Sequence, residues 1–290
     1  MSTQSHIVTA LPAPVRLRKY AVGIFFAAPT GAALKKAIHK RRVFVDGVAA
    51  TSDTFVRGGE RIELILPEET TPRRRLVFPL TVLYEDERIA AIHKPAGILV
   101  SGNTFKTITA ALPQNLRRGT LPDAVKPQPA HRLDYPTTGI VLVGKTNGGI
   151  RALNKLFADK AIEKTYYAVT MGEMPAAGSI DAPVDERSAR SRYRVIRSVP
   201  SRRFGVLNLV ELQPETGRRH QLRKHLAGIG SPILGDRDYG KEGLLLKGKG
   251  MYLHAYSLRF THPFTEEEMY LVDELPAGFR KIFPEDSVSL

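Results

Sequence analysis

The stretch PAHRLDYPTTGIVLVGKT, residues 129–146, has the strongest local pattern in the chain. It places one carboxylate, Asp134, between two prolines and ahead of an apolar run at residues 140–143. Proline fixes one backbone dihedral and the Thr-Thr-Gly that follows favours a turn, so this segment should be rigid. A short apolar run bounded by turn residues is typical of a buried strand. Asp134 is therefore expected in a rigid turn at a core edge, whereas an ordinary Asp in a turn only caps local structure.

A second segment, TGRRHQLRKHLAGIGSPILGDRDYG at residues 216–240, supplies cations that could keep this carboxylate ionised. We expect a helix over residues 216–228, with Arg219 and Arg223 at the flank of its apolar stripe. The stripe comprises Leu222, Leu226 and Ile229. A guanidinium at a core edge is partly desolvated and can hold a carboxylate with two parallel hydrogen bonds. The alternative is that these arginines are solvated surface charges.

The overall charge of the chain favours a polyanionic partner. Its 43 Lys and Arg residues exceed its 29 Asp and Glu residues, which gives a net charge of +14. Such a balance is typical of proteins that bind nucleic acid or an anionic membrane, although some basic proteins bind neither. No apolar run approaches the ~18 residues of a membrane span. We therefore expect nucleic acid as the partner and no membrane association.

The chain contains no cysteine, which excludes several kinds of chemistry. Disulfides, thiolate metal sites and cysteine nucleophiles are ruled out, including the nucleophile used to methylate uridine at carbon 5. His220 and His225 are five residues apart and cannot share a metal as an i, i+4 pair could. Neither a GxGxxG fingerprint nor a P-loop is present. We expect no metal, no cofactor and a reducing, cytoplasmic environment.

The first 75 residues predict a small basic module. Leu34, Ala37, Ile38 and Arg41 recur at helical spacing, and Asp46-Gly47 between apolar runs is a strong hairpin signal. A further strand is expected at residues 61–66. These 75 residues carry 13 Lys and Arg against 6 Asp and Glu. We predict a small α/β module with an N-terminal extension over residues 1–70, suited to binding a phosphate backbone, and a linker over 71–79. The alternative is a basic helix without function.

The remaining residues, 80–290, predict one larger domain. Its short apolar runs lie at residues 82–84, 89–92, 140–143, 166–169, 206–212 and 252–260. Only two helices are clear, at residues 149–157 and 218–228. Strands that outnumber helices in this way indicate an α+β domain with a mixed, largely antiparallel central sheet flanked by helices and loops.

Two further segments carry candidate functional groups. In EKTYYA, residues 163–168, adjacent tyrosines in a strand must face opposite sides, so one ring at most faces a site. Buried aromatic rings often serve only the core, but a tyrosine beside a catalytic group can stack on an extruded base. In HKPAG, residues 93–97, a strand ends in a rigid turn with one cation, Lys94. The alternative is that this segment is only a turn.

These segments together resemble the pseudouridine synthases of the RluA type, over roughly residues 78–264. The similar segments, in order, are HKPAG, HRLDYPTTG, KTYYAV, residues 216–240 and YLHAYSLRFTHP. The resemblance implies a long mixed sheet with an active cleft across its middle. It also implies cofactor-free isomerisation of uridine to pseudouridine in structured ribosomal or transfer RNA. The N-terminal module is similar to the RNA-binding domain of ribosomal protein S-four.

The resemblance assigns roles to individual residues. It implies that Asp134 is the catalytic aspartate, Tyr166 the family's tyrosine and Arg223 the ionic partner of the aspartate. It makes Leu253 the leucine that packs in the active site and Arg132 an arginine that contacts RNA. Further contacts with the substrate are expected from His131, Lys164, Lys94 and Arg218.

The chain departs from the family pattern at two positions, and two other readings of it stay open. Thr138 stands where the family usually has Ser, and His93 where it often has Asn. A non-catalytic RNA-binding or ribosome-assembly protein would keep the basic surfaces and survive loss of Asp134. A nucleic-acid N-glycosidase would use the same aspartate but release free base. In every case we expect a monomer, and the sequence points to no protein partner.

Overall fold

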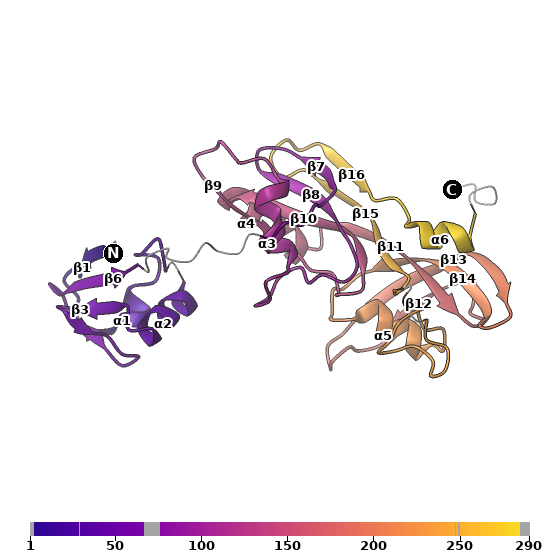
Figure 1. Ribbon diagram of the computed structural model, residues 1–290, viewed down its shortest axis with the longest axis horizontal. Coiled ribbons are helices and arrows are strands. Elements are labelled where there is room, and N and C mark those ends of the chain that lie inside the picture. Colours follow the sequence, from indigo (N-terminus) through magenta and orange to yellow (C-terminus); the bar gives the residue numbers. More distant parts are fainter. Residues whose placement is uncertain (1–2, 29, 67–75, 247, 249, 285–290) are drawn as a thin grey trace. The chain divides into compact units, whose positions relative to one another are not determined.

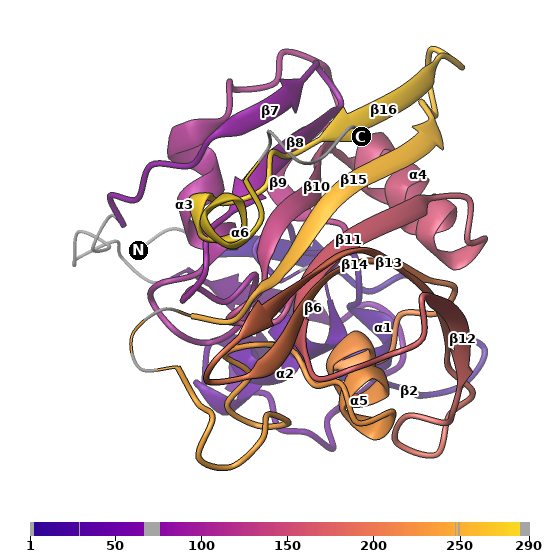
Figure 2. The same ribbon diagram turned by 90° about the vertical axis from the view of Figure 1, so that its right-hand side faces the viewer.

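The computed structural model describes residues 3–28, 30–66, 76–246, 248 and 250–284. The chain divides into two compact units, Met1–Arg75 and Leu76–Leu290, shown from two directions in Figures 1 and 2. Of the predicted linker, residues 71–75 lie outside the described residues, and residues 76–79 form neither helix nor strand. No helix in the described part of the chain is long and apolar enough to cross a bilayer.

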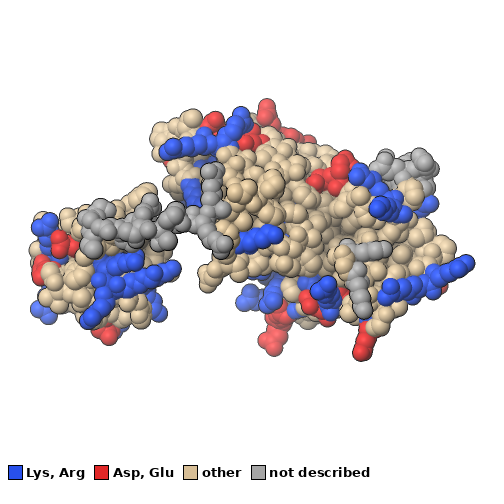
Figure 3. Space-filling model, in the orientation of Figure 1, with Lys and Arg blue, Asp and Glu red and all other residues tan. Residues whose placement is uncertain are grey.

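The first unit is a small α/β module with a basic surface. Its four-stranded antiparallel sheet has the order β1-β6-β3-β4, and β2 pairs with β5 beside it. Lys and Arg side chains gather on the face of this unit that Figure 3 shows. The elements are β1 (Thr3–Ile7), β2 (Val15–Arg16), α1 (Leu17–Tyr20), α2 (Gly31–His39), β3 (Val43–Val45), β4 (Val48–Ala49), β5 (Phe55–Val56) and β6 (Arg61–Ile65).

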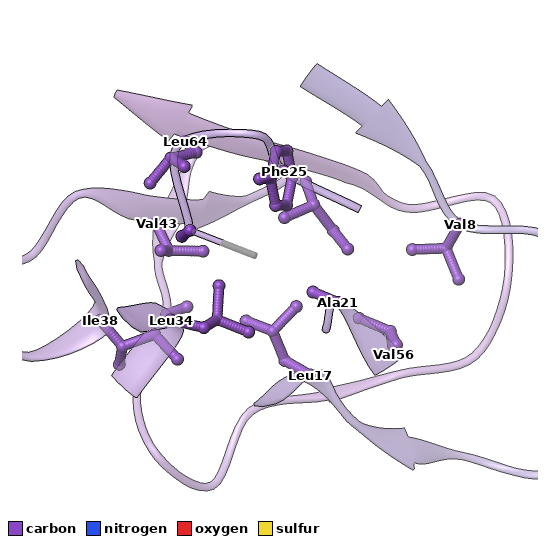
Figure 4. Packing of buried hydrophobic residues seen from close by; sticks show 12 residues of the cluster. Val8, Leu17, Ala21, Phe25, Leu34, Ile38, Val43, Val56 and Leu64 are labelled. Atoms are coloured by element: carbon purple, nitrogen blue, oxygen red, sulfur yellow. The ribbon is translucent and has the colours of Figure 1, made fainter. Parts of the chain in front are cut away.

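Local sequence explains the helix and the hairpin of this unit. The hydroxyl of Thr30 accepts a hydrogen bond from the main-chain N–H of Ala33 and so caps the start of α2. Leu34 and Ile38 of α2 are buried in the core that Figure 4 shows. Asp46 and Gly47 both have positive φ, as a two-residue hairpin turn requires. The predicted helix and hairpin are therefore present, whereas β1 and α1, in the unpatterned first 30 residues, were not predicted.

The second unit is built on one ten-stranded sheet, and its α+β class agrees with the prediction. The main path is β12-β13-β14-β11-β15-β10-β8-β7, with β16 beside β15 and β9 beside β10. The strands are β7 (Val82–Glu85), β8 (Ile89–Lys94), β9 (Ala124–Pro129), β10 (Thr138–Thr146), β11 (Glu163–Met171), β12 (Ala177–Asp181), β13 (Arg190–Ser201), β14 (Gly205–Pro214), β15 (Leu253–Thr261) and β16 (Glu268–Val272). The helices are α3 (Ile108–Asn115), α4 (Asn147–Ala158), α5 (Gln221–Gly228) and α6 (Ala277–Ile282).

The two halves of this sheet meet at a short parallel junction between β10 and β15. Only Thr138 and Gly139 pair there, with His254 and Ala255. Gly139 has φ +121°, and a Cβ at this position would lie 2.3 Å from the carbonyl oxygen of Ala255. The junction therefore requires glycine. All other strand pairs in the described residues of the sheet are antiparallel.

One predicted helix begins later than the sequence suggested. Helix α5, which lies beside β12–β14 in Figure 2, starts at Gln221 and not at residue 216. His220 adopts a left-handed conformation with φ 56°, and the Gln221 side chain accepts hydrogen bonds from Thr216 Oγ1 and the Arg218 main-chain N–H. These bonds hold residues 216–220 in a loop. Leu222 and Leu226 are buried as predicted, but Ile229 lies beyond the helix and is 40% exposed.

Candidate active site

A cavity of about 180 Å³ lies where the turn before β10, strands β11 and β15 and the loop before α5 come together. Six of the predicted site residues line it: Arg132, Asp134, Lys164, Tyr166, Arg218 and Leu253. These residues are spread over more than 100 positions of the sequence, from Arg132 to Leu253. The sheet therefore brings the separate sequence motifs to one place.

Lys94 fixes the main chain around Asp134 through hydrogen bonds. The Thr137 N–H donates a hydrogen bond to the Asp134 carbonyl over 3.1 Å, which closes the turn. Lys94 Nζ donates to the carbonyl oxygens of Pro95, Tyr135 and Thr137, the last at 2.7 Å. Burial lowers the pKa of Lys94 to about 8, although the negative charge of Asp134 opposes the shift. Lys94 is fully buried and is not among the residues that line the cavity. Its hydrogen bonds hold the turn, and its predicted contact with the substrate stays a prediction.

Arg223 places a buried cation beside the Asp134 carboxylate. Its Nη1 lies 3.7 Å from Asp134 Oδ2, and its side chain is 2% exposed. The bidentate pairing that we expected with Asp134 is made instead with Asp236, at 2.7 Å from Nε and 2.6 Å from Nη2. Nη2 also donates to Asp238 Oδ2 over 2.6 Å. The guanidinium is thus held by two other carboxylates, with one amino group left to face Asp134.

The electrostatics of this cluster keep Arg223 charged. Burial alone would lower the pKa of Arg223, but the hydrogen bonds to Asp236 and Asp238 outweigh it and raise the pKa. Burial likewise opposes ionisation of Asp236, and the hydrogen bonds from Arg223 lower its pKa nonetheless. Arg223 is therefore a permanent, immobile positive charge next to Asp134.

His220 is a second neighbour of the carboxylate, and we did not predict it as a site residue. Its Nε2 lies 3.8 Å from Asp134 Oδ1, while its Nδ1 is 3.0 Å from the Tyr239 hydroxyl. Burial and the charges of Arg223 and Arg219 lower the pKa of His220, against the opposing effect of Asp134. No sequence signal points to His220, because a left-handed histidine ahead of a helix has no local motif. Asp236 and Asp238 did have one, the Asp-x-Asp in the GDRDYG turn.

Tyr166 faces the cavity and Tyr167 faces the opposite side of the sheet, as strand alternation predicts. Tyr166 pairs with Ala255 of β15 and Leu212 of β14, so the ring is held at the sheet centre. Burial and the negative charge of Asp134 raise its pKa, which keeps the phenol protonated. Tyr167 instead packs edge-to-face on Tyr256 with ring centroids 5.0 Å apart.

Cationic side chains surround the mouth of the cavity. Arg132 and Arg218 are exposed, and Lys164 is partly buried. Burial and the neighbouring charge of Lys160 lower the pKa of Lys164. Leu253, the first residue of β15, adds an apolar wall. Such a cavity can accept a flat, neutral group, while the anionic groups on either side of that group stay at the cationic rim.

His131 is not among the residues that line this cavity, and its predicted contact with the substrate stays a prediction. Its Nε2 accepts a hydrogen bond from the Leu142 N–H over 3.0 Å, and its ring lies 4.6 Å from that of Phe157. Burial, aided by the charge of Lys164, lowers the pKa of His131 to about 3. The neutral ring thus serves β10 from outside the cavity. In the described residues, no group of three His, Asp or Glu side chains is arranged to hold a metal ion.

Residues 88–228 match the family described as RNA pseudouridylate synthase. The chain is 31% identical over 278 residues to an Aquifex aeolicus protein named as an RNA pseudouridine synthase, covering 86% of this chain and 87% of the relative. It is 31% identical to ribosomal large subunit pseudouridine synthase D of Nitrosomonas europaea, over 87% of this chain and 80% of that one. It is also 31% identical to tRNA pseudouridine synthase C of Vibrio cholerae, over 70% of this chain and 96% of the relative.

The fold agrees with a solved structure of the same kind. The human protein RNA pseudouridylate synthase domain containing 4 superposes with a TM-score of 0.56 at 28% identity. The superposition covers 69% of this chain and 90% of the human one.

Proposed function

Since the chain belongs to the RNA pseudouridine synthase family, we propose that Asp134 is the catalytic group with which it isomerises uridine in RNA. The observation that carries this assignment is the fixed, buried guanidinium of Arg223 at 3.7 Å from Asp134 in a cavity at the sheet centre. A permanent cation favours the ionised form of a nearby carboxylate.

The arrangement of the cavity suits the steps of the isomerisation. The reaction breaks the C–N glycosidic bond, turns the base and joins its carbon 5 to the same sugar carbon. It therefore needs one ionised carboxylate and an enclosure that retains the base and keeps out water. In this proposal Tyr166 and Leu253 hold the extruded base, and Arg223 is the counterion of Asp134.

We further propose that the substrate is ribosomal or transfer RNA, as the names of the relatives suggest. Arg132, Lys164 and Arg218 at the cavity rim would contact phosphates that flank the target uridine. The first unit, with its exposed basic residues, would bind RNA in the manner of the ribosomal protein S-four domain. The enzyme would act as a monomer in the cytoplasm, where it meets these RNAs.

The variant Asp134→Asn tests this proposal. It keeps the shape of the side chain and should abolish pseudouridine formation while RNA affinity stays within about twofold, because most of the interface is unchanged. The matched control is Asp159→Asn, which alters a carboxylate on the end of α4, paired with Lys155 and 52% exposed. Pseudouridine mapping of total RNA, with and without the protein, identifies the target. Full activity in Asp134→Asn contradicts the assignment, and release of free uracil by the wild type indicates an N-glycosidase instead.

A further inference from the structure

One buried hydroxyl beside the catalytic turn has no partner. In the part of the chain that the structure describes, Thr137 Oγ1 is the only buried side-chain polar atom without a hydrogen bond. Thr137 is 2% exposed and is one of the residues that line the cavity with Asp134. It lies three positions after that aspartate, at the end of the same turn.

Hydrogen bonds fix the backbone of Thr137 on both sides. The Thr137 N–H donates to the Asp134 carbonyl, and the Thr137 carbonyl accepts from Lys94 Nζ over 2.7 Å. The next two residues, Thr138 and Gly139, pair with β15. The turn therefore sets the position of the Thr137 Cβ, from which the hydroxyl projects.

Other buried threonines of this unit behave differently. Thr107 and Thr146 each cap a helix, accepting hydrogen bonds from Ala110 N and Gly149 N. Thr170 donates to Met174 Sδ and accepts from Asn208 Nδ2. A buried hydroxyl without a partner destabilises a fold, and valine would fill the same volume without that cost. The presence of threonine at position 137 is explained if the bound substrate supplies the hydrogen-bond partner that the hydroxyl lacks.

We propose that the Thr137 hydroxyl donates a hydrogen bond to an oxygen of the target uridine, which makes it a further substrate-contacting residue of the reaction. The inference rests on the proposed role of the Asp134 cavity as the uridine site. A uridine offers suitable acceptors, the carbonyl oxygens of the base and the hydroxyl oxygens of the ribose. The guanidinium of Arg223 beside Asp134 is already held by Asp236 and Asp238, whereas the Thr137 hydroxyl has no partner to give up when the nucleotide binds.

The test compares Thr137→Val with Thr137→Ser in thermal unfolding and in steady-state kinetics. Thr137→Val should unfold at the wild-type temperature or above it, because it removes an unpaired buried hydroxyl, while kcat/KM falls about 3- to 10-fold for one lost hydrogen bond. Thr137→Ser keeps the hydroxyl and should keep kcat/KM. The matched control, Thr170→Val, removes two bonds and should lower the unfolding temperature without a specific loss of kcat/KM.

A second measurement separates the uridine from Asp134 as the acceptor. In an Asp134→Ala background, Thr137→Val should still weaken binding of substrate RNA about 3- to 10-fold. Loss of this effect would show that the hydroxyl serves Asp134 and would overturn the proposal. RNA with an abasic target nucleotide locates the acceptor, since a ribose contact survives removal of the base and a base contact does not.

Two further outcomes also overturn the inference. One is wild-type kcat/KM in Thr137→Val, and the other is a large drop in its unfolding temperature or a failure to fold, which would show that the hydroxyl has a structural partner. Either result, obtained while Asp134→Asn remains inactive, leaves the proposed role of Asp134 intact. Activity of Asp134→Asn would instead remove the premise.

Discussion

Arg223 can act as a fixed counterion because other residues hold it. Asp236 binds it with two hydrogen bonds and is itself fully buried, whereas the Asp238 side chain is 60% exposed. Removing one partner of a buried ion pair typically costs ~3–5 kcal/mol, and an exposed pair contributes below ~1 kcal/mol. The two aspartates should therefore differ sharply in importance.

We expect Asp236→Asn to lower the single-turnover rate by about 100-fold, because the guanidinium loses its fixed orientation toward Asp134 and a small misplacement of a catalytic group has an effect of this size. The same variant should lower thermal stability, while Asp238→Asn should change both quantities little. Rate and unfolding temperature are measured on the same preparations. Equal effects of the two variants would show that Asp236 has no special part in holding Arg223.

For single residues, the sequence predicted which side chains lie together better than it predicted which of them form hydrogen bonds. Asp134, Tyr166 and Leu253 do lie together, because each belongs to a motif with strong local constraints. The predicted ion pair of Arg223 with Asp134 is present, but the two parallel hydrogen bonds go to Asp236, since three carboxylates compete for one guanidinium and only the folded chain decides among them. His131 carries a ring that turns toward Phe157, and no local pattern indicates such a direction.

Among the elements, the junction of β10 and β15 gives the sharpest prediction. In Gly139→Ala the new Cβ would meet the Ala255 main chain at 2.3–2.7 Å, so backbone must move. We expect a loss of stability of at least ~1–3 kcal/mol and a marked loss of isomerisation, because Asp134 sits just ahead of the displaced strand. Thermal unfolding and single-turnover kinetics measure both.

The control for this prediction is Gly205→Ala, at the first residue of β14. Gly205 also has positive φ, 76°, but a Cβ there meets nothing within 4 Å. The Gly205→Ala variant introduces backbone strain without a clash. Its effect should therefore be smaller than that of Gly139→Ala and confined to stability. Comparable losses in the two variants would mean that the close approach at the junction is unimportant.

The strands that the sequence predicted are those with continuous apolar runs. β13 was missed because Arg190, Arg192 and Arg194 occupy every second position, and its apolar content is low. In the fold these arginines are exposed on one face and pair with Glu211 and Glu215 of the next strand and loop. The alternation of charged and buried residues is itself a strand pattern, but it is easily mistaken for a polar segment.

For the molecule as a whole, the first unit should add affinity and leave the chemistry to the second. Its exposed cations include Lys35, Lys36 and Lys40, and its sequence offers no candidate nucleophile. Each cation placed on a phosphate releases about one counterion. Deleting residues 1–75 should therefore weaken RNA binding and flatten the dependence of log affinity on log salt concentration.

A salt titration of RNA binding, run beside single-turnover kinetics at saturating enzyme, measures this prediction. The chemical step on bound RNA should be largely unchanged by the deletion, since the second unit has its own core and cavity. An unchanged salt slope would show that the first unit does not contact RNA.

The pairing of β10 with β15 also has a consequence for folding of the nascent chain during translation. Residues 138 and 139 must wait for residues 254 and 255 to be synthesised, and the cavity lacks its Leu253 wall until then. The first unit has a complete core of its own and needs none of these later residues. A nascent protein that ends before residue 253 can therefore fold its basic module but cannot yet modify RNA. Catalytic competence comes only after residues 253–255 are synthesised and the long-range strand pairing closes the sheet.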